Sequence, residues 1–225
     1  MQKNDIKTMG YVLRRTNYGE ADRILNLITP LGKISAVAKG VRREKSKLAG
    51  GIEMFSLSEY TIHVGRSELG IVTSAKMIKY HSNIIKDYNR MEVAALILKK
   101  VSIAAEHSEN AEYFEIVSQA LEALDEMNDS RLVEAWFLLR LVKATGEETN
   151  LYRDVSGEKL KADKRYEWDK YESAFVEKAD GNFGPNEIKL FRIAASSSFK
   201  MVNKIRLDEN ELMRLSYFSK TVAKM

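Results

Sequence analysis

RILNLITPLGKISAVAKG, residues 23–40, contains two apolar runs separated by a turn signal. Pro30, one of only two prolines in the chain, stands in TPLGK between RILNLIT (23–29) and KISAVAKG (33–40). The second run alternates with a period of two, which is typical of a strand with one buried face. We therefore expect a β-hairpin in which Ile34, Ala36 and Ala38 face the core while Lys33 and Lys39 share the outer face.

Further strand patterns surround this hairpin. YTIHVG (60–65) places Tyr60 on the apolar side of an alternating run, and LGIVTSAKMIKY (69–80) supplies another strand. About five short strands with glycine-containing turns in the first eighty residues are typical of a small, closed or partly open β-barrel. We expect this barrel to occupy residues 1–80.

The pattern becomes helical after residue 88. Helices are expected at 88–107, 110–127, 131–146, 186–204 and 209–223, the first apolar on nearly all sides and therefore buried at the centre. Asp208 and Glu211 have the spacing of a capping box at the start of the last helix. The fold class is thus α+β, with a helical domain over 81–225 and an irregular insert at about 147–184.

Composition narrows the possible functions. The chain has 225 residues and no cysteine, so disulfides and thiolate metal sites are excluded. The first eighty residues carry 14 Lys and Arg against 7 Asp and Glu, and therefore favour polyanionic partners. No membrane-spanning apolar run and no signal segment is present in this sequence, which predicts a cytoplasmic protein without membrane contact.

The basic charge is concentrated in AVAKGVRREKSKLAGG, residues 36–51. Five cations lie within nine positions here, opposed only by Glu44, and glycines on both sides allow a close approach of the backbone to a ligand. Composition alone leaves two interpretations open. The segment is either a solvated basic loop or a surface that holds phosphates.

Catalytic motifs are absent from the sequence. There is no G-x-G-x-x-G, G-x-S-x-G or H-E-x-x-H, and the three histidines lack metal-ligand spacing. The acidic residues of 110–134 fall on the polar faces of amphipathic helices. We therefore expect no enzyme, no catalytic residue and no cofactor.

The order of residues adds what composition cannot. VLRR (12–15), YGEADRIL (18–25), T-P-LGKISAVAKG (29–40), RR-x-KS-x-L-x-G (42–50) and FSLSEY (55–60) closely resemble the N-terminal region of the RecO family of bacterial recombination mediators. The resemblance implies an OB-fold followed by a helical domain. It also implies binding of single- and double-stranded DNA, annealing of complementary strands, and help in loading recombinase onto DNA coated with single-strand-binding protein. RecR and the acidic C-terminal tail of single-strand-binding protein are the implied partners, in a bacterial, nucleoid-associated setting.

The chain departs from the family in one region. Many members carry a four-cysteine zinc hairpin in the helical domain, whereas here Asp154 and Ser156 of NLYRDVSG stand near the first cysteine pair and SAFVEKAD (173–180) replaces the second. Zinc needs thiolate or imidazole ligands that this region lacks. We expect a metal-free hairpin, shorter or more mobile than its relatives, that relies on packing by Tyr166, Trp168 and Phe175.

Candidate site residues follow from the pattern and the resemblance together. The expected DNA-binding cations are Arg14, Arg15, Arg23, Lys33, Lys39, Arg42, Arg43, Lys45 and Lys47. Tyr18 is the expected base-stacking residue. We expect Glu20 and Asp22 to orient Arg23 or nearby loop amides by charge-assisted hydrogen bonds. A partner tail is expected at the basic surface of Lys189, Arg192, Lys200, Lys204 and Arg206.

Three alternatives stay open at this point. An OB-fold of RNA metabolism would carry a similar basic loop, a nuclease would need acidic residues that gather around a metal, and a non-catalytic scaffold would use the loop to contact an acidic protein.

Overall fold

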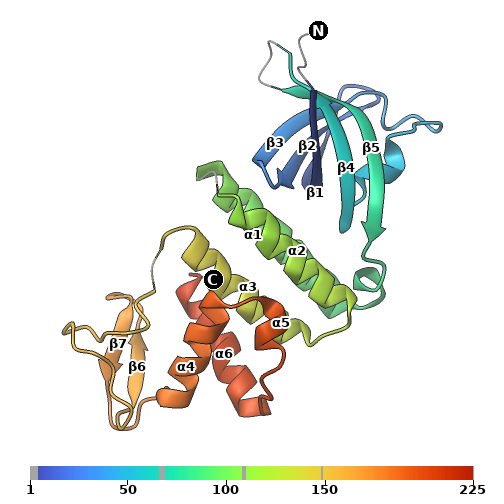
Figure 1. Ribbon diagram of the computed structural model, residues 1–225. Coiled ribbons are helices and arrows are strands. Elements are labelled where there is room, and N and C mark those ends of the chain that lie inside the picture. The colour runs from blue at the N-terminus through green and yellow to red at the C-terminus, as the bar shows by residue number, and fades with distance from the viewer. Residues whose placement is uncertain (1–4, 66–68, 108–109, 148, 225) are drawn as a thin grey trace. The chain divides into compact units, whose positions relative to one another are not determined.

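The computed structural model describes residues 5–65, 69–107, 110–147 and 149–224. The chain forms two compact units, Met1–Met127 and Asn128–Met225, and each is described by itself. A five-stranded sheet precedes the helices, so the predicted α+β class is confirmed (Figure 1). Within the described ranges, no helix combines the length and the apolar character needed to cross a membrane.

The sheet of the first unit consists of β1 (Asp5–Tyr18), β2 (Asp22–Thr29), β3 (Gly32–Ala38), β4 (Ser56–His63) and β5 (Gly70–Tyr80). The strands pair in the order β1-β2-β3-β5-β4, and β4 pairs again with β1, so that the sheet forms a barrel. The predicted hairpin is β2–β3, in which Leu25 pairs with Ala36 and Leu27 with Ile34. Its turn requires Gly32, whose φ of +95° is unfavourable for other residues.

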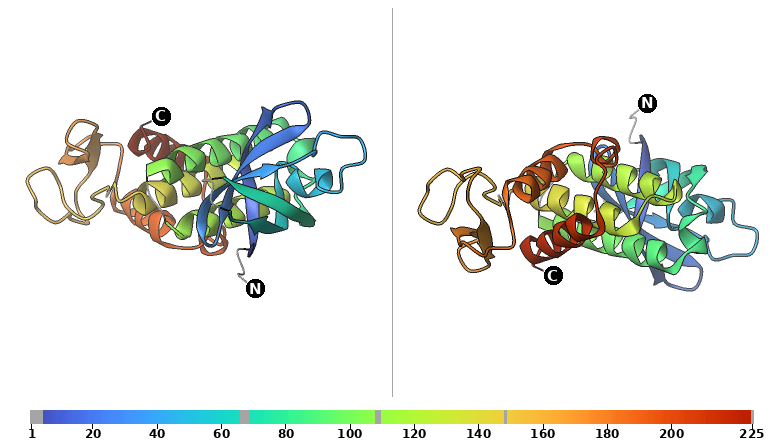
Figure 2. Two further views of the ribbon diagram at one scale, coloured as in Figure 1. Left: turned by 90° about the horizontal axis from the view of Figure 1, so that it is seen from above. Right: turned by 90° about the horizontal axis from the view of Figure 1, so that it is seen from below.

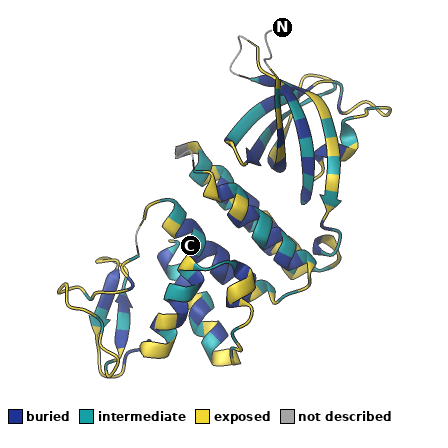
Figure 3. Cartoon of the chain, in the orientation of Figure 1, coloured by how far each residue is buried: buried dark blue, intermediate teal, exposed yellow. Residues whose placement is uncertain are grey.

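The barrel interior follows the predicted alternation. Ala36, Ala38 and Tyr60 are fully buried, together with Leu25 and Leu27 from β2. Buried positions alternate with more exposed ones along the strands of the sheet (Figure 3). A 3-10 helix, η1 (Ala49–Ile52), packs against β4 and β5, and its Gly51 carbonyl accepts a 2.8 Å hydrogen bond from the Tyr60 hydroxyl. A side chain at Gly51 would collide with the backbone of Ala75, so η1 lies close against β5.

Two helices of the first unit, α1 (Tyr88–His107) and α2 (Glu112–Asp125), follow a short 3-10 turn, η2 (Ile84–Lys86), and pack side by side (Figures 1 and 2). One face of α2 is buried, with Tyr113, Val117 and Leu124 among its buried residues. The prediction that α1 is a central, buried helix was wrong. Tyr88, Met91 and Ile103 are exposed, because α1 packs against the sheet and α2 along one face only.

A buried polar cluster joins β1, the end of β5 and α2. His81 is fully buried, with Nε2 3.4 Å from the Tyr11 hydroxyl and Nδ1 3.6 Å from Asp125 Oδ2. Burial lowers the pKa of His81, and the carboxylate of Asp125 opposes this effect only in part. Asp125 also accepts a 3.0 Å hydrogen bond from the Asn83 amide, which holds the β5–α1 connection against α2.

The second unit is built on α3 (Ser130–Ala144), whose residues 132–139 are all buried. Around it lie α4 (Pro185–Ser196), α5 (Phe199–Val202), α6 (Glu209–Val222) and the hairpin of β6 (Tyr166–Asp169) and β7 (Ala174–Glu177). The single helix predicted at 186–204 is two helices, because the chain becomes extended at Ser197 and Ser198. The Ser197 carbonyl accepts a 2.9 Å hydrogen bond from the Trp136 indole instead. The predicted capping box of Asp208 and Glu211 is present at α6.

Candidate nucleic-acid interface

The basic segment forms a short, anchored loop between β3 and η1. We call residues 39–47 the basic loop. Val41 is buried in the barrel core and Leu48 packs against the same core, so both ends of the loop are fixed. Between these anchors successive turns are closed by hydrogen bonds from the Arg43 amide to Gly40 O (3.1 Å) and from the Ser46 amide to Arg43 O (3.0 Å).

The cations of this loop are exposed to solvent. All five of its cationic residues are exposed, namely Lys39, Arg42, Arg43, Lys45 and Lys47. Within the described part of the chain, none of them has a carboxylate oxygen within 4.0 Å of its side-chain nitrogens. The loop therefore presents several unpaired positive charges on a backbone that is held in place, an arrangement suited to binding a phosphate chain.

The turn between β1 and β2 holds the start of the basic loop. A carboxylate oxygen of Asp22 accepts a 2.7 Å hydrogen bond from the Gly40 amide. The Arg42 amide donates to Ala21 O at 2.9 Å, and the Arg42 guanidinium donates to Gly19 O at 3.4 Å. The prediction that a carboxylate of this turn orients a loop amide is therefore confirmed for Asp22, whereas Glu20 makes no such hydrogen bond among the described residues.

Two neighbouring arginines of β1, beside a β-bulge, have different exposure and different contacts. The register with β2 shifts between Val12 and Arg14. Arg14 is exposed, whereas Arg15 turns toward η1 and donates to Ile52 O at 3.3 Å and to Glu53 Oε2 at 3.2 Å. The structure thus leaves Arg14 available to a ligand and engages Arg15 within the protein.

Two further predicted cations are also engaged. The Lys33 side chain is only 17% exposed and lies 3.4 Å from Glu106 of α1, although alternation correctly places it on the outer face of β3. Arg23 donates from Nε to Asn17 Oδ1 at 3.2 Å. Both have polar side-chain partners within the protein, Glu106 and Asn17, which makes them weaker candidates for phosphate contact than the basic loop.

Sequence reasoning missed a polar row across the outer face of β1, β2 and β3. Arg14 pairs with Asn26, which pairs with Ser35, and the Ser35 hydroxyl lies 3.1 Å from Asn26 Oδ1. The sequence did carry a signal for this row, since each of these strands has a polar residue at a position that alternation places on the outer face. Tyr18, at the end of β1, is 55% exposed, so one aromatic ring lies beside this row's strands and remains accessible for stacking.

The five cations predicted to bind a partner tail come from α4, from α5 and from the segment after α5. Lys189 is exposed on α4, Lys200 on α5, and Lys204 and Arg206 beyond α5. Arg192 alone among these five lines one of the described pockets. Its Nε donates to Leu151 O at 2.8 Å, and its guanidinium lies 4.5 Å from the centre of the Tyr152 ring.

The Arg192 pocket has a volume of about 510 Å³. Apolar walls come from Leu139, Val142 and Leu151, and Lys143 and Arg153 add two further cations. No acidic residue is among the described residues that line it. A guanidinium held by a carbonyl and a ring, in a pocket whose described lining residues include no carboxylate, suits a carboxylate ligand with an apolar neighbour.

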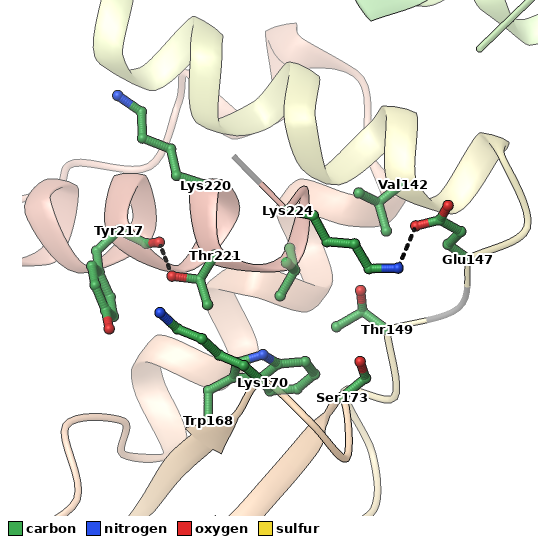
Figure 4. A pocket seen from close by; sticks show the side chains of 11 residues that line it. Val142, Glu147, Thr149, Trp168, Lys170, Ser173, Tyr217, Lys220, Thr221 and Lys224 are labelled. Atoms are coloured by element: carbon green, nitrogen blue, oxygen red, sulfur yellow. Dashed lines mark hydrogen bonds and ion pairs between the residues drawn. The ribbon is translucent and has the colours of Figure 1, made fainter. Parts of the chain in front are cut away.

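A second pocket of the same unit, of about 580 Å³, lies between α6, the end of α3 and the β6–β7 hairpin (Figure 4). Trp168 and Val142 contribute apolar surface, and Lys170, Lys220 and Lys224 surround it. Lys220 already lies 3.0 Å from Glu134, and Lys224 lies 3.7 Å from Glu147. Two of its three ammonium groups are thus neutralised, so this pocket suits an anion less well than the Arg192 pocket.

The β6–β7 region does not fit a zinc ion. No cluster of three or more His, Cys, Asp or Glu side chains able to hold a metal exists among the described residues. Asp154 Oδ1 instead accepts from the Ser156 amide (2.9 Å), the Ser156 hydroxyl (2.6 Å) and the Glu158 amide (3.0 Å). The Ser156 hydroxyl is the main cause that lowers the pKa of Asp154. The carboxylate thus closes the turn with hydrogen bonds.

Aromatic packing supports the same hairpin. Tyr166 and Phe175 are buried, as predicted, and Trp168 is 9% exposed. Phe175 contacts the rings of Trp168, Phe183 and Phe218 at centroid distances of 5.0, 6.0 and 5.7 Å. The hairpin is therefore attached to α6 by rings rather than by a metal centre.

The fold and the site define an α+β protein with a five-stranded N-terminal barrel, an anchored basic loop and a helical C-terminal part. Family models described as Recombination protein O N terminal and Recombination protein O C terminal match residues 1–81 and 85–222. The chain therefore belongs to the RecO family.

Curated relatives agree with this assignment. Proteins named DNA repair protein RecO from Alkaliphilus metalliredigens and Dehalococcoides mccartyi are 36% and 34% identical to the chain over 156 and 150 residues. A protein of the same name from Thermoanaerobacter sp. is 32% identical over 144 residues. These matches cover 67%, 66% and 63% of this chain, and 62%, 59% and 58% of the respective relatives.

Proposed function

We propose that this protein is a DNA-binding recombination mediator in DNA repair, and not an enzyme. It binds single- and double-stranded DNA, anneals complementary strands and helps load recombinase onto DNA coated with single-strand-binding protein. The observation that carries the proposal is the basic loop, whose exposed cations have no carboxylate partners among the described residues. Family membership supports the same function.

The loop's chemistry explains how annealing works without nucleotide hydrolysis. Two DNA strands repel each other through their phosphates, and cations that contact both strands lower this repulsion. The grip is indifferent to sequence because it touches backbone rather than base edges. Tyr18 adds stacking on an unpaired base, which any base can provide.

An annealing assay tests this function. Complementary oligonucleotides, naked or coated with single-strand-binding protein, are mixed with the wild type and with the double variant Arg42→Ala/Arg43→Ala. We expect the variant to anneal more slowly in both cases with its thermal unfolding little changed, since both residues are exposed and the one backbone contact of the Arg42 guanidinium, with Gly19 O, is long at 3.4 Å. Wild-type annealing at the spontaneous rate would refute the proposal.

We assign the binding of protein partners to residues 81–225 and the binding of DNA to residues 1–80. We place the acidic, apolar-ended tail of single-strand-binding protein in the Arg192 pocket, whose cations and apolar walls match such a peptide. RecR is a second partner, and the cell compartment is the bacterial cytoplasm, at the nucleoid.

A peptide titration tests this placement. A fluorescent tail peptide should bind the wild type saturably and bind Arg192→Ala at least tenfold more weakly, since a charged hydrogen bond is lost. Lys189→Ala, which removes an exposed cation from the same helix, is the matched control and should bind like the wild type. Equal binding by Arg192→Ala and the wild type would exclude the pocket.

The principal alternative is an RNA-binding protein with the same barrel. Competition between single-stranded DNA and RNA of equal length separates the two functions, since an RNA-specific protein would prefer RNA by a large factor. Incubation with labelled DNA and magnesium or manganese tests for a nuclease, and we expect no cleavage. A non-catalytic scaffold would leave annealing at its spontaneous rate.

A further inference from the structure

Asp22 is an acidic residue in the middle of the basic surface. By charge alone it weakens the attraction of the surface for phosphates, because it lies in the turn that contacts Arg42. Its carboxylate, however, accepts the 2.7 Å hydrogen bond from the Gly40 amide, at the first residue of the loop's turns. The geometry therefore gives this residue a task that its charge does not explain.

The first residues of the basic loop contact the short turn between β1 and β2. The Gly40 amide and the Arg42 amide both donate into residues 21–22, at 2.7 and 2.9 Å. Gly40 has a φ of +63°, a left-handed conformation that glycine adopts without strain, so the chain can turn sharply at this position. Tyr18 pairs with Asp22 at the other end of the same turn, so the exposed ring and the loop cations share one support.

We propose that Asp22 is a positioning residue of the DNA grip, which fixes the basic loop relative to Tyr18 before DNA arrives. This inference rests on the proposed DNA binding and deepens it. A loop that is already ordered loses less conformational entropy when its side chains bind phosphates. Losing the carboxylate would leave the loop cations present but no longer held in register with one another.

Two variants of equal charge separate position from electrostatics. Asp22→Ala removes the negative charge and the acceptor, whereas Asp22→Asn removes the charge but keeps an acceptor oxygen for the Gly40 amide. Glu20→Gln, in the same turn, removes one negative charge from an exposed residue and is the matched control. Electrostatics alone predicts that all three variants bind single-stranded DNA at least as tightly as the wild type.

The positioning role predicts a different order. Asp22→Ala should bind a labelled single strand about three- to tenfold more weakly than the wild type, the cost of ordering one or two further side chains. Its salt slope should also be shallower, since fewer phosphates are contacted at once. Asp22→Asn and Glu20→Gln should bind as tightly as the wild type or more tightly.

Two results would overturn the inference: Asp22→Ala binding like Glu20→Gln, or Asp22→Asn binding as weakly as Asp22→Ala. Thermal unfolding of each variant shows that binding is measured on folded protein, and rescue by Asn excludes a general loss of structure. If Arg42→Ala/Arg43→Ala binds DNA like the wild type, the proposed function itself fails. If that variant is weak while Asp22→Ala is not, only the positioning role fails.

Discussion

The salt dependence of DNA binding gives the sharpest test of the basic loop. The structure leaves six exposed cations without carboxylate partners among the described residues on this surface, namely Arg14, Lys39, Arg42, Arg43, Lys45 and Lys47. Each contact with a single strand contributes about 0.7 to the slope of log K against log salt, so six contacts give about 4. A fourfold rise in salt should then weaken binding about 300-fold. Arg42→Ala/Arg43→Ala should reduce the slope to about 3, and the same rise in salt should cost only about 50-fold.

The measurement is fluorescence anisotropy of a labelled single strand, titrated at several salt concentrations between about 50 and 200 mM. The matched control is Lys7→Ala/Lys76→Ala, which removes the same charge from exposed lysines on either side of Glu59 in the β1–β4–β5 part of the sheet. Its slope should equal that of the wild type. An unchanged slope in the loop variant, or an equal loss of slope in the control, would refute the assignment of phosphate contacts to the loop.

Three further outcomes are expected. Tyr18→Ala should lose about 1–3 kcal/mol of single-strand affinity, with duplex affinity unchanged, because stacking needs an unpaired base; equal losses on both substrates would contradict this. Phe175→Ala should destabilise the second unit by about 3–5 kcal/mol in denaturant unfolding, whereas a zinc chelator should leave the wild type unchanged, and a chelator effect would indicate a metal. The free energy of unfolding should fall as pH drops below about 6.5, because His81 becomes protonated in the unfolded chain while burial keeps it neutral in the native protein. Unfolding of His81→Gln, measured at pH values of about 5 to 7.5, should show a shallower decline. An identical decline in the variant would mean that another group causes the effect.

Local patterns were enough to predict the features that depend on neighbouring residues. The alternation of Ile34, Ala36 and Ala38 predicted the buried face of β3, and the spacing of Asp208 and Glu211 predicted the cap of α6. Both can be read from the residue types within a few positions along the chain, although the face of β3 is buried by residues as distant as Tyr60 and Val72. The order of residues in the basic segment likewise predicted the exposed loop, since charged side chains between apolar anchors stay in solvent.

Features that depend on distant partners could not be predicted. The bulge at Arg14 depends on register with β2, and the pairing of Lys33 with Glu106 joins positions far apart in the sequence. The break between α4 and α5 falls at Ser197, whose carbonyl accepts a hydrogen bond from the Trp136 indole. The helical periodicity of the sequence gives no sign of this bond. The charge of Arg192 made it a candidate for partner binding, but its position depends on contacts of its guanidinium with Leu151 O and the Tyr152 ring.

The closed turn at Asp154 and the rings around Phe175 have a chemical consequence for the β6–β7 hairpin. A thiolate-bound metal centre can be oxidised by peroxide or emptied by competing ligands, and its hairpin unfolds with it. Here hydrogen bonds to one carboxylate and stacked rings hold the chain, and the sequence has no cysteine to oxidise. The hairpin should keep its shape when metal is scarce, and also under the oxidising conditions that break DNA.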